Sequence, residues 1–243
     1  MRFNFQSVSA PFLHLSFQYI YMNMKLSNSQ LCIAFLVGLF AVSCAGSVQE
    51  VVNPAQAPVK INKIVIVPFY SDPDYSEEES EETRVAKEQF LTDALYDELV
   101  SREKGLDIVP LETAKSEIKR VETENPGITY KDTFLKVGKN LNADAVLTGS
   151  ISDYTQREGG EFGVTSPASV VFDVQLYNPV NGQLIWEAYF VEAQKTLLEN
   201  VVEVRKFIKR RGKWVKADEL AKEGVVEIVD KLDEFLKSNV ATN

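Results

Sequence analysis

The alternation and clustering of apolar residues predict several strands in the middle of the chain. Residues 61–69 and 143–154 are continuous runs of β-branched and small apolar residues, which is typical of strands buried on both faces. Residues 168–177 alternate strictly between apolar and polar side chains, a turn follows at 178–182, and 184–193 form the returning strand of a hairpin. We expect one face of this hairpin to pack on the core and the other to be more exposed.

Other segments carry the three- and four-residue apolar spacing of amphipathic helices. Helices are predicted over residues 83–102, 111–124, 129–141, 197–208 and from about 218 onward. Thr129 is placed to cap the third of these, and a short strand is predicted at 106–110. The predicted fold class is α/β (α+β): a mixed β-sheet of about five strands flanked by helices, with a C-terminal amphipathic helix.

Two polar loops between these elements are candidates for ligand binding. Residues 71–82 hold seven acidic side chains, but they lack the alternating oxygen ligands and central glycine of an EF-hand calcium loop. We interpret this segment as a solvated loop that leads into the positive end of a helix. Residues 155–167 are rich in glycine, but these glycines do not follow a strand and open a helix, so a phosphate cradle is not expected.

Residues 24–45 have the order of a secretory signal peptide. One basic residue and a polar spacer precede a 12-residue apolar core at 31–42, and Ser43 then precedes Cys44. A membrane-spanning helix needs roughly 20 consecutive apolar residues, so this core is short for one. A cysteine after a small residue resembles the lipobox of bacterial lipoproteins, although Ala41 stands where that family usually has leucine. The resemblance implies cleavage between Ser43 and Cys44 and acylation of Cys44; a cleaved signal without lipid and an uncleaved anchor are the alternatives.

The segments on either side of the signal differ in character. Residues 1–23 are rich in aromatic side chains, and we interpret them as a misassigned start or an extended N-terminus. Residues 44–60 contain two prolines and no apolar period, which predicts a lipidated tether. At roughly 3.3 Å per residue this tether would span about 50 Å at full stretch.

The charge balance and the scarcity of histidine and cysteine exclude several function classes. The chain has 26 Lys+Arg and 35 Asp+Glu; residues 1–43 hold two of the basic residues and no acid, so the mature chain would carry a net charge of −11. Proteins that bind nucleic acid need a basic surface instead. His14, the only histidine, and Cys32 both precede Cys44. Nucleophilic catalysis with histidine, intramolecular disulfides and a His/Cys zinc site are thereby excluded, and no catalytic residue, metal or cofactor is assigned.

Residues 194–243 are assigned as a basic helical segment and a C-terminal helix that packs on the mixed α/β domain of residues 61–193. The basic side chains follow one another without an intervening acid: Arg205, Lys206, Lys209, Arg210, Arg211, Lys213 and Lys216. Such a run could contact anionic lipid headgroups, an acidic partner or the chain's own acidic loop. A solvated helix C-terminus is the simpler alternative.

Three motifs resemble those of a group of bacterial envelope proteins: Lys63–Phe69 (KIVIVPF), Asn142–Ile151 (NADAVLTGSI) and Gly182–Trp186 (GQLIW). The group includes the amino-terminal domain of TolB, the curli secretion lipoprotein and the lipoprotein activator of penicillin-binding proteins. The resemblance covers roughly residues 61–193 and implies a fold more than a particular activity.

The physical roles of these motifs are expected to be structural. Gly149 follows small residues in a strand and is expected to allow close backbone approach. Asp144 is expected to cap a strand end rather than act as an acid, and Trp186 is expected to pack in the hairpin.

The leading hypothesis is a membrane-anchored periplasmic lipoprotein that acts as a non-enzymatic binding or assembly protein of the cell envelope. Its partners would be the lipid bilayer, through acylated Cys44, and an envelope protein or cell-wall component. Because Ala45 rather than aspartate follows the cysteine, the usual sorting pattern implies the outer membrane, with the domain facing the periplasm.

Two other classes of function are weighed against it. A subunit of a secretion-channel-like oligomer would need barrel hairpins, and residues 155–167 are too short and too polar to supply one. A carboxylate-based glycan-processing enzyme would have its candidate cluster at Asp153, Glu158 and Glu161.

Overall fold

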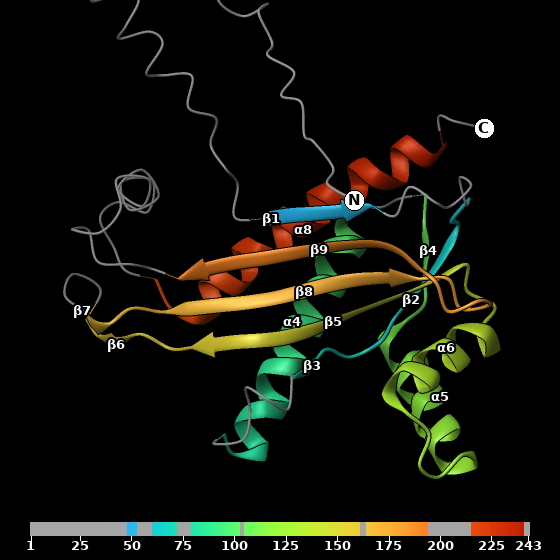
Figure 1. The fold of residues 1–243 in the computed structure, drawn as a ribbon, viewed down its shortest axis with the longest axis horizontal. Coiled ribbons are helices and arrows are strands. Elements are labelled where there is room, and N and C mark those ends of the chain that lie inside the picture. Colours follow the sequence, from blue (N-terminus) through green and yellow to red (C-terminus); the bar gives the residue numbers. More distant parts are fainter. Residues whose placement is uncertain are drawn as a thin grey trace, which may run out of the picture. The chain divides into compact units, whose positions relative to one another are not determined.

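A seven-stranded sheet dominates the computed structural model, which describes residues 48–52, 60–71, 79–102, 105–160, 164–193 and 215–240 (Figure 1). The strand order is β1-β9-β8-β5-β2-β4, and β3 also pairs with β5. The strands are β1 (Val48–Val52), β2 (Lys63–Ile66), β3 (Tyr70–Ser71), β4 (Asp107–Ile108), β5 (Ala145–Thr155), β8 (Ser169–Tyr177) and β9 (Leu184–Ala193). A separate small hairpin consists of β6 (Glu158–Gly159) and β7 (Val164–Ser166).

The sheet is mixed, as the sequence predicts. Strand β2 runs parallel to β4 and β5, and β3 also runs parallel to β5. Strands β5, β8, β9 and β1 follow as antiparallel neighbours. Five predicted strand segments contain β2, β4, β5, β8 and β9, so the α/β class is confirmed, with seven strands in the main sheet rather than about five.

Strand β1 corrects the prediction of an unstructured tether. Val48–Val52 pairs with β9 along its whole length, from Val48 opposite Phe190 to Val52 opposite Trp186. The sequence of β1, VQEVV, is short, and backbone pairing with the longer strand β9 stabilises it. Local composition does not reveal that β9 is its partner. The tether prediction is therefore wrong for these five residues.

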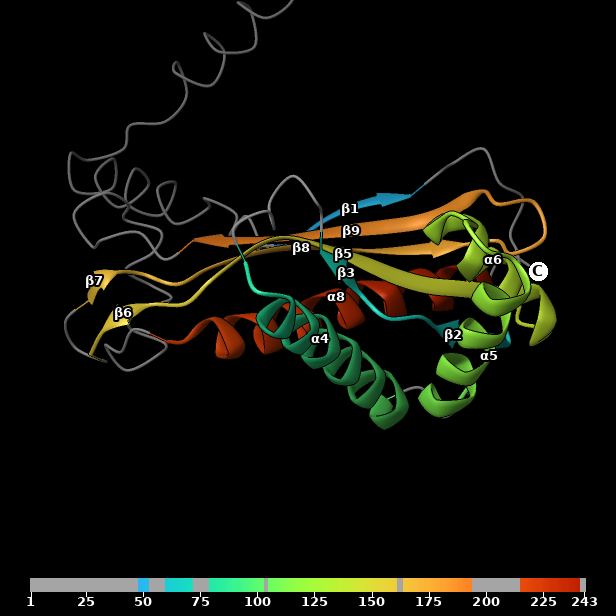
Figure 2. The same cartoon turned by 90° about the horizontal axis from the view of Figure 1, so that it is seen from below.

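Four helices flank the sheet in the described part of the chain: α4 (Glu81–Arg102), α5 (Leu111–Glu124), α6 (Tyr130–Asn140) and α8 (Ala217–Val240). Helices α4 and α8 contact each other, and α8 contacts β8 and β9. Figure 2 shows α4 and α8 along one side of the long strands, with α5 and α6 gathered at the end where β2 lies. None of the described helices combines the length and the apolar content needed to cross a bilayer.

Alternate residues of the strands divide the interior into two apolar clusters. Ile64 and Ile66 of β2 belong to the larger cluster beneath α4 and α8, whereas Val65 and Val67 belong to a smaller one beneath α5 and α6. The larger cluster continues through the apolar positions of β5, β8 and β9. The second face of β5, β8 and β9 carries the polar residues Thr148, Ser150, Asp173, Gln175 and Glu187, and the candidate site lies on this face.

Several predicted structural roles are confirmed. A Cβ at Gly149 would lie 2.2 Å from Phe69 Cε1 and 2.6 Å from the carbonyl oxygen of Asp173, so the close approach requires glycine. Asp144 Oδ2 accepts hydrogen bonds from the backbone N–H groups of Asn62 and Lys63, at 2.8 and 2.9 Å, where β2 begins. The Trp186 side chain is fully buried, as expected for a packing role.

Candidate functional site

The predicted lipidation and cleavage residues, Cys44 and Ser43, lie outside the described residues. So do six members of the basic run: Arg205, Lys206, Lys209, Arg210, Arg211 and Lys213. The seventh, Lys216, is exposed and directly precedes α8, where its carbonyl oxygen accepts backbone hydrogen bonds from Glu219 and Leu220. Lipidation, cleavage and the role of the basic run therefore stay predictions.

The carboxylates weighed as a glycan-processing cluster occupy different settings. Asp153, on β5, accepts hydrogen bonds from the hydroxyl groups of Ser169 and Thr155. Glu158 is exposed on β6, and Glu161 lies outside the described residues. In the described part of the chain, no hydrogen bond or ion pair joins Asp153 to Glu158.

A different polar site is built by the register of the strands. Tyr70, Ser150, Asp173 and Tyr189 lie opposite one another on β3, β5, β8 and β9 and form one row across the sheet. The adjacent row consists of Thr148, Gln175 and Glu187. Directly opposite side chains in a sheet are about 5 Å apart, so these two rows form a continuous patch, here called the acidic rows.

Asp173 lies at the centre of the acidic rows. Its side chain is only 7% exposed, and its Oδ1 accepts a hydrogen bond from the Ser150 hydroxyl. The other carboxylate oxygen, Oδ2, is buried without a hydrogen-bond partner. Burial, with a further contribution from the charge of Glu187, raises the pKa of Asp173 to about 6, against the opposing effect of the Ser150 hydrogen bond.

Glu187 is the second buried carboxylate of the acidic rows, also 7% exposed. It accepts hydrogen bonds from the Gln175 amide and the Tyr189 hydroxyl. Tyr177 in turn donates to the Gln175 carbonyl oxygen at 2.8 Å. These bonds fix the Glu187 side chain on the sheet face without supplying a positive charge.

Tyrosine rings flank the two carboxylates. Tyr70 packs against Tyr130, with ring centroids 4.7 Å apart, and the Tyr130 hydroxyl lies 3.0 Å from Thr148 Oγ1. Burial raises the pKa of both Tyr130 and Tyr177, so their hydroxyl groups stay protonated. The amine of Lys131 lies over the Tyr177 ring, 5.0 Å from its centroid. Tyr189, on β9 at the opposite end of the row from Tyr70, is 38% exposed.

The chemistry available in the acidic rows is acceptance of hydrogen bonds and attraction of positive charge. Neither Asp173 nor Glu187 forms an ion pair with another described residue. The described residues also contain no group of three His, Cys, Asp or Glu side chains placed to hold a metal ion.

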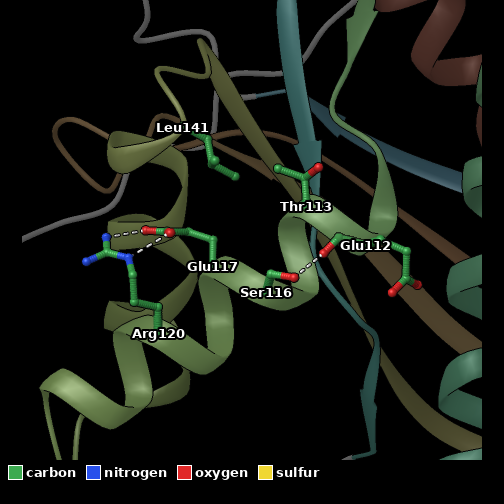
Figure 3. A pocket seen from close by; sticks show the side chains of 6 residues that line it. All are labelled: Glu112, Thr113, Ser116, Glu117, Arg120 and Leu141. Atoms are coloured by element: carbon green, nitrogen blue, oxygen red, sulfur yellow. Dashed lines mark hydrogen bonds and ion pairs between the residues drawn. The ribbon is translucent and has the colours of Figure 1, made fainter.

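A hollow of about 480 Å³ lies elsewhere, on the outer surface of α5, and is lined by Glu112, Thr113, Ser116, Glu117, Arg120 and Leu141 (Figure 3). Arg120 donates to both carboxylate oxygens of Glu117, at 2.6 and 2.9 Å. These hydrogen bonds lower the pKa of Glu117 and raise that of Arg120. Because these two charges neutralise each other, the Glu117–Arg120 pair leaves neither of its charges uncompensated in the hollow.

Asp173 and Glu187 are not among the candidate site residues predicted from the sequence. The second face of the hairpin is predicted to be more exposed, which holds for Tyr189 and Val191 but is wrong for both carboxylates. Acidic residues on the face of two neighbouring strands opposite to the larger apolar cluster were the available signal. The patch also includes Tyr70, opposite Ser150, and is bordered by Tyr130, whose hydroxyl contacts Thr148, and both residues come from distant parts of the chain.

No protein-family model matches the sequence, and no curated protein matches it. Solved structures share its fold at low sequence identity. The PelC dodecamer from Paraburkholderia phytofirmans is 16% identical, with a TM-score of 0.40 over 75% of this chain and 93% of that one. Lipoprotein GNA1162 from Neisseria meningitidis is 15% identical, with a TM-score of 0.33 over 62% and 93%.

TolB from Acinetobacter baumannii is 15% identical, with a TM-score of 0.26 over 67% of this chain and 28% of that one. TolB belongs to the group that the three sequence motifs resemble, and it is among the solved structures to which this chain is similar.

Proposed function

We propose that this chain is a membrane-anchored lipoprotein of the cell envelope that acts by binding a partner rather than by catalysis. The observation that carries the proposal is the arrangement of residues 41–48. Cys44 follows a short apolar signal core and small residues, and the first strand of the domain begins only four residues later, at Val48.

This spacing makes the anchor short. Four residues at 3.3–3.6 Å each span at most about 14 Å. A domain whose β1 is paired into the sheet would then be held close to the bilayer surface by acylated Cys44, rather than at the end of a tether of about 50 Å. The edge of the sheet formed by β1 would face or adjoin the lipid.

The binding role is supported by the residues available after Cys44. Residues 45–243 contain neither histidine nor cysteine, which removes the common nucleophile–base pairs. The buried carboxylates of the acidic rows lie on a sheet face with exposed Tyr189 and Val191 beside them. Tyrosine is enriched in surfaces that contact another protein, so the exposed Tyr189 and Val191 side chains beside these carboxylates support a binding role.

The location that we propose is the periplasmic side of the outer membrane, because Ala45 follows the cysteine. The proposed partner is another envelope protein. Crosslinking in intact envelopes tests the binding role: a photoreactive residue at Val191 should give one defined product, and the same residue at Val180, which is 75% exposed in the hairpin turn, should not. Absence of any product specific to position 191 contradicts the binding role.

A further inference from the structure

We infer that the acidic rows are a recognition site for an arginine side chain of the partner protein, held by Asp173 and Glu187 and flanked by tyrosine rings. The inference rests on the proposed binding function and specifies the chemistry of its surface. Three independent features of the described residues support it.

The first feature is an unsatisfied acceptor. Asp173 Oδ2 is buried and has no hydrogen-bond partner, while Oδ1 is held by Ser150. A buried acceptor without a partner costs free energy, and native proteins rarely retain one without a function. The Ser150 bond fixes the orientation of the carboxylate, so Oδ2 stays directed at the same place on the face.

The second feature is uncompensated negative charge. Asp173 and Glu187 lie one row apart on neighbouring strands, a separation of about 7 Å across the diagonal. The amide and hydroxyl groups that contact Glu187 carry no positive charge. A guanidinium group presents five N–H donors in one plane and can bridge two carboxylates, whereas an ammonium group is a compact point charge.

The third feature is the aromatic border. Tyr70 and Tyr189 occupy the same row as Asp173, on either side of Ser150 and Asp173. Tyrosine faces attract cations, and a planar guanidinium also stacks on them. Tyr189 lies directly opposite Asp173 on β9 and is 38% exposed, so its ring is available to a cation that reaches this carboxylate.

An exposed apolar rim indicates that the arginine belongs to a protein segment rather than to a free small molecule. Val51 and Val191 are 52% and 53% exposed and lie on the same face, opposite Glu187 and Val171 respectively. A free cation would leave these side chains in water, but a partner segment would cover them.

The test uses the full protein extracted in mild detergent and a labelled decapeptide in which arginine alternates with serine. Fluorescence polarisation should detect binding, and replacing each arginine by neutral citrulline should weaken it at least tenfold. The lysine version should bind several-fold more weakly than the arginine version. Equal binding of the citrulline peptide overturns the inference.

Variants locate the site on the protein. The pair Asp173→Asn and Glu187→Gln should weaken binding of the arginine peptide at least tenfold. The matched control, Glu112→Gln with Glu219→Gln, removes two exposed charges from α5 and α8 and should leave binding unchanged. If the double variant fails to fold, Tyr189→Ser, which removes an exposed ring, should still weaken binding several-fold.

The outcomes separate this inference from the proposed function. Unchanged peptide affinity in a folded double variant overturns the acidic rows as the site, even where crosslinking at Val191 recovers a partner. Arginine amide that binds as tightly as the decapeptide overturns the assignment to a protein segment. Peptide binding with no crosslinked product in envelopes leaves the site standing and contradicts the proposed function instead.

Discussion

Asp173 and Glu187 lie on neighbouring antiparallel strands, one row apart on the same face of the sheet, and each is only 7% exposed. Two carboxylates in this relation destabilise each other when both are ionised. The fold retains them although an apolar pair would pack in the same place without that cost. The pair is therefore better explained by what it binds than by what it contributes to stability.

The first prediction concerns stability and pH. The pKa of Asp173 is raised to about 6, above the value of about 3.9 in an unfolded chain. As pH rises, the Asp173 carboxyl therefore ionises at a lower pH in the unfolded state than in the folded state. The free energy of unfolding consequently falls between about pH 4 and pH 6. The Asp173→Asn variant cannot ionise and avoids this loss, which amounts to about 2–3 kcal/mol for a shift of this size.

Denaturant unfolding of the two proteins at pH 4 and pH 7.5 measures the difference. Asp173→Asn should be more stable than the wild type at pH 7.5, and the gap should nearly close at pH 4. An asparagine variant that is less stable at pH 7.5 would show that Asp173 is stabilised, not penalised, in its ionised form.

The second prediction concerns how the affinity for the arginine peptide depends on pH. Only ionised Asp173 attracts a guanidinium fully, so affinity for the arginine peptide should rise several-fold from pH 5 to pH 7.5 in the wild type. The titratable groups that interact with the Asp173 carboxylate are Glu187, Tyr177 and Tyr189, and Lys131 lies over the Tyr177 ring. Burial raises the pKa of Tyr177 and Tyr189, so neither tyrosine ionises in this range. Fluorescence polarisation across pH should lose this dependence in Asp173→Asn.

The third prediction concerns the close packing at Gly149. A methyl group there would overlap Phe69 and the backbone oxygen of Asp173. Gly149→Ala should therefore lower the free energy of unfolding by about 2–4 kcal/mol. Gly105→Ala is the matched control, since no atom lies within 4 Å of the added Cβ, and it should change stability little. Equal effects of the two substitutions in urea unfolding would refute the packing argument.

The fourth prediction concerns the cap at Asp144. Its Oδ2 satisfies two backbone donors, those of Asn62 and Lys63, where β2 enters the sheet. Asp144→Ala leaves both without this acceptor and should cost about 1–3 kcal/mol. Asp144→Asn keeps an acceptor oxygen and should lose less, by the same unfolding measurement. A larger loss in the asparagine variant would point to the charge, not the hydrogen bonds, as the important property.

Features of the fold that depend on neighbouring residues could be predicted from the sequence, whereas features that depend on distant residues could not. Thr129 caps α6 through the Asp132 backbone N–H, and Gly182 adopts a positive φ of 70° in the hairpin turn; both are local features that the sequence displays. Strand β1 depends on pairing with β9, more than 130 residues away, so its short sequence could not identify it.

The site was less predictable for the same reason. Asp173 is a polar residue on an alternating strand, which usually indicates a solvated face. Asp173 lies directly opposite Ser150, which donates a hydrogen bond to it, and that register is a property of the folded sheet. Cys44 is the opposite case, because its chemistry depends on the residues just before it and can be inferred without any structure.

Acylation of Cys44 is the central claim, and mass spectrometry of the mature N-terminus tests it most directly. Membrane-extracted wild type should begin at Cys44 and carry the added mass of fatty acyl groups, and radiolabelled fatty acid should be incorporated. Cys44→Ser should show neither the acyl mass nor the label. A wild-type N-terminus without acyl mass at Cys44, or label retained on Cys44→Ser, would contradict the account.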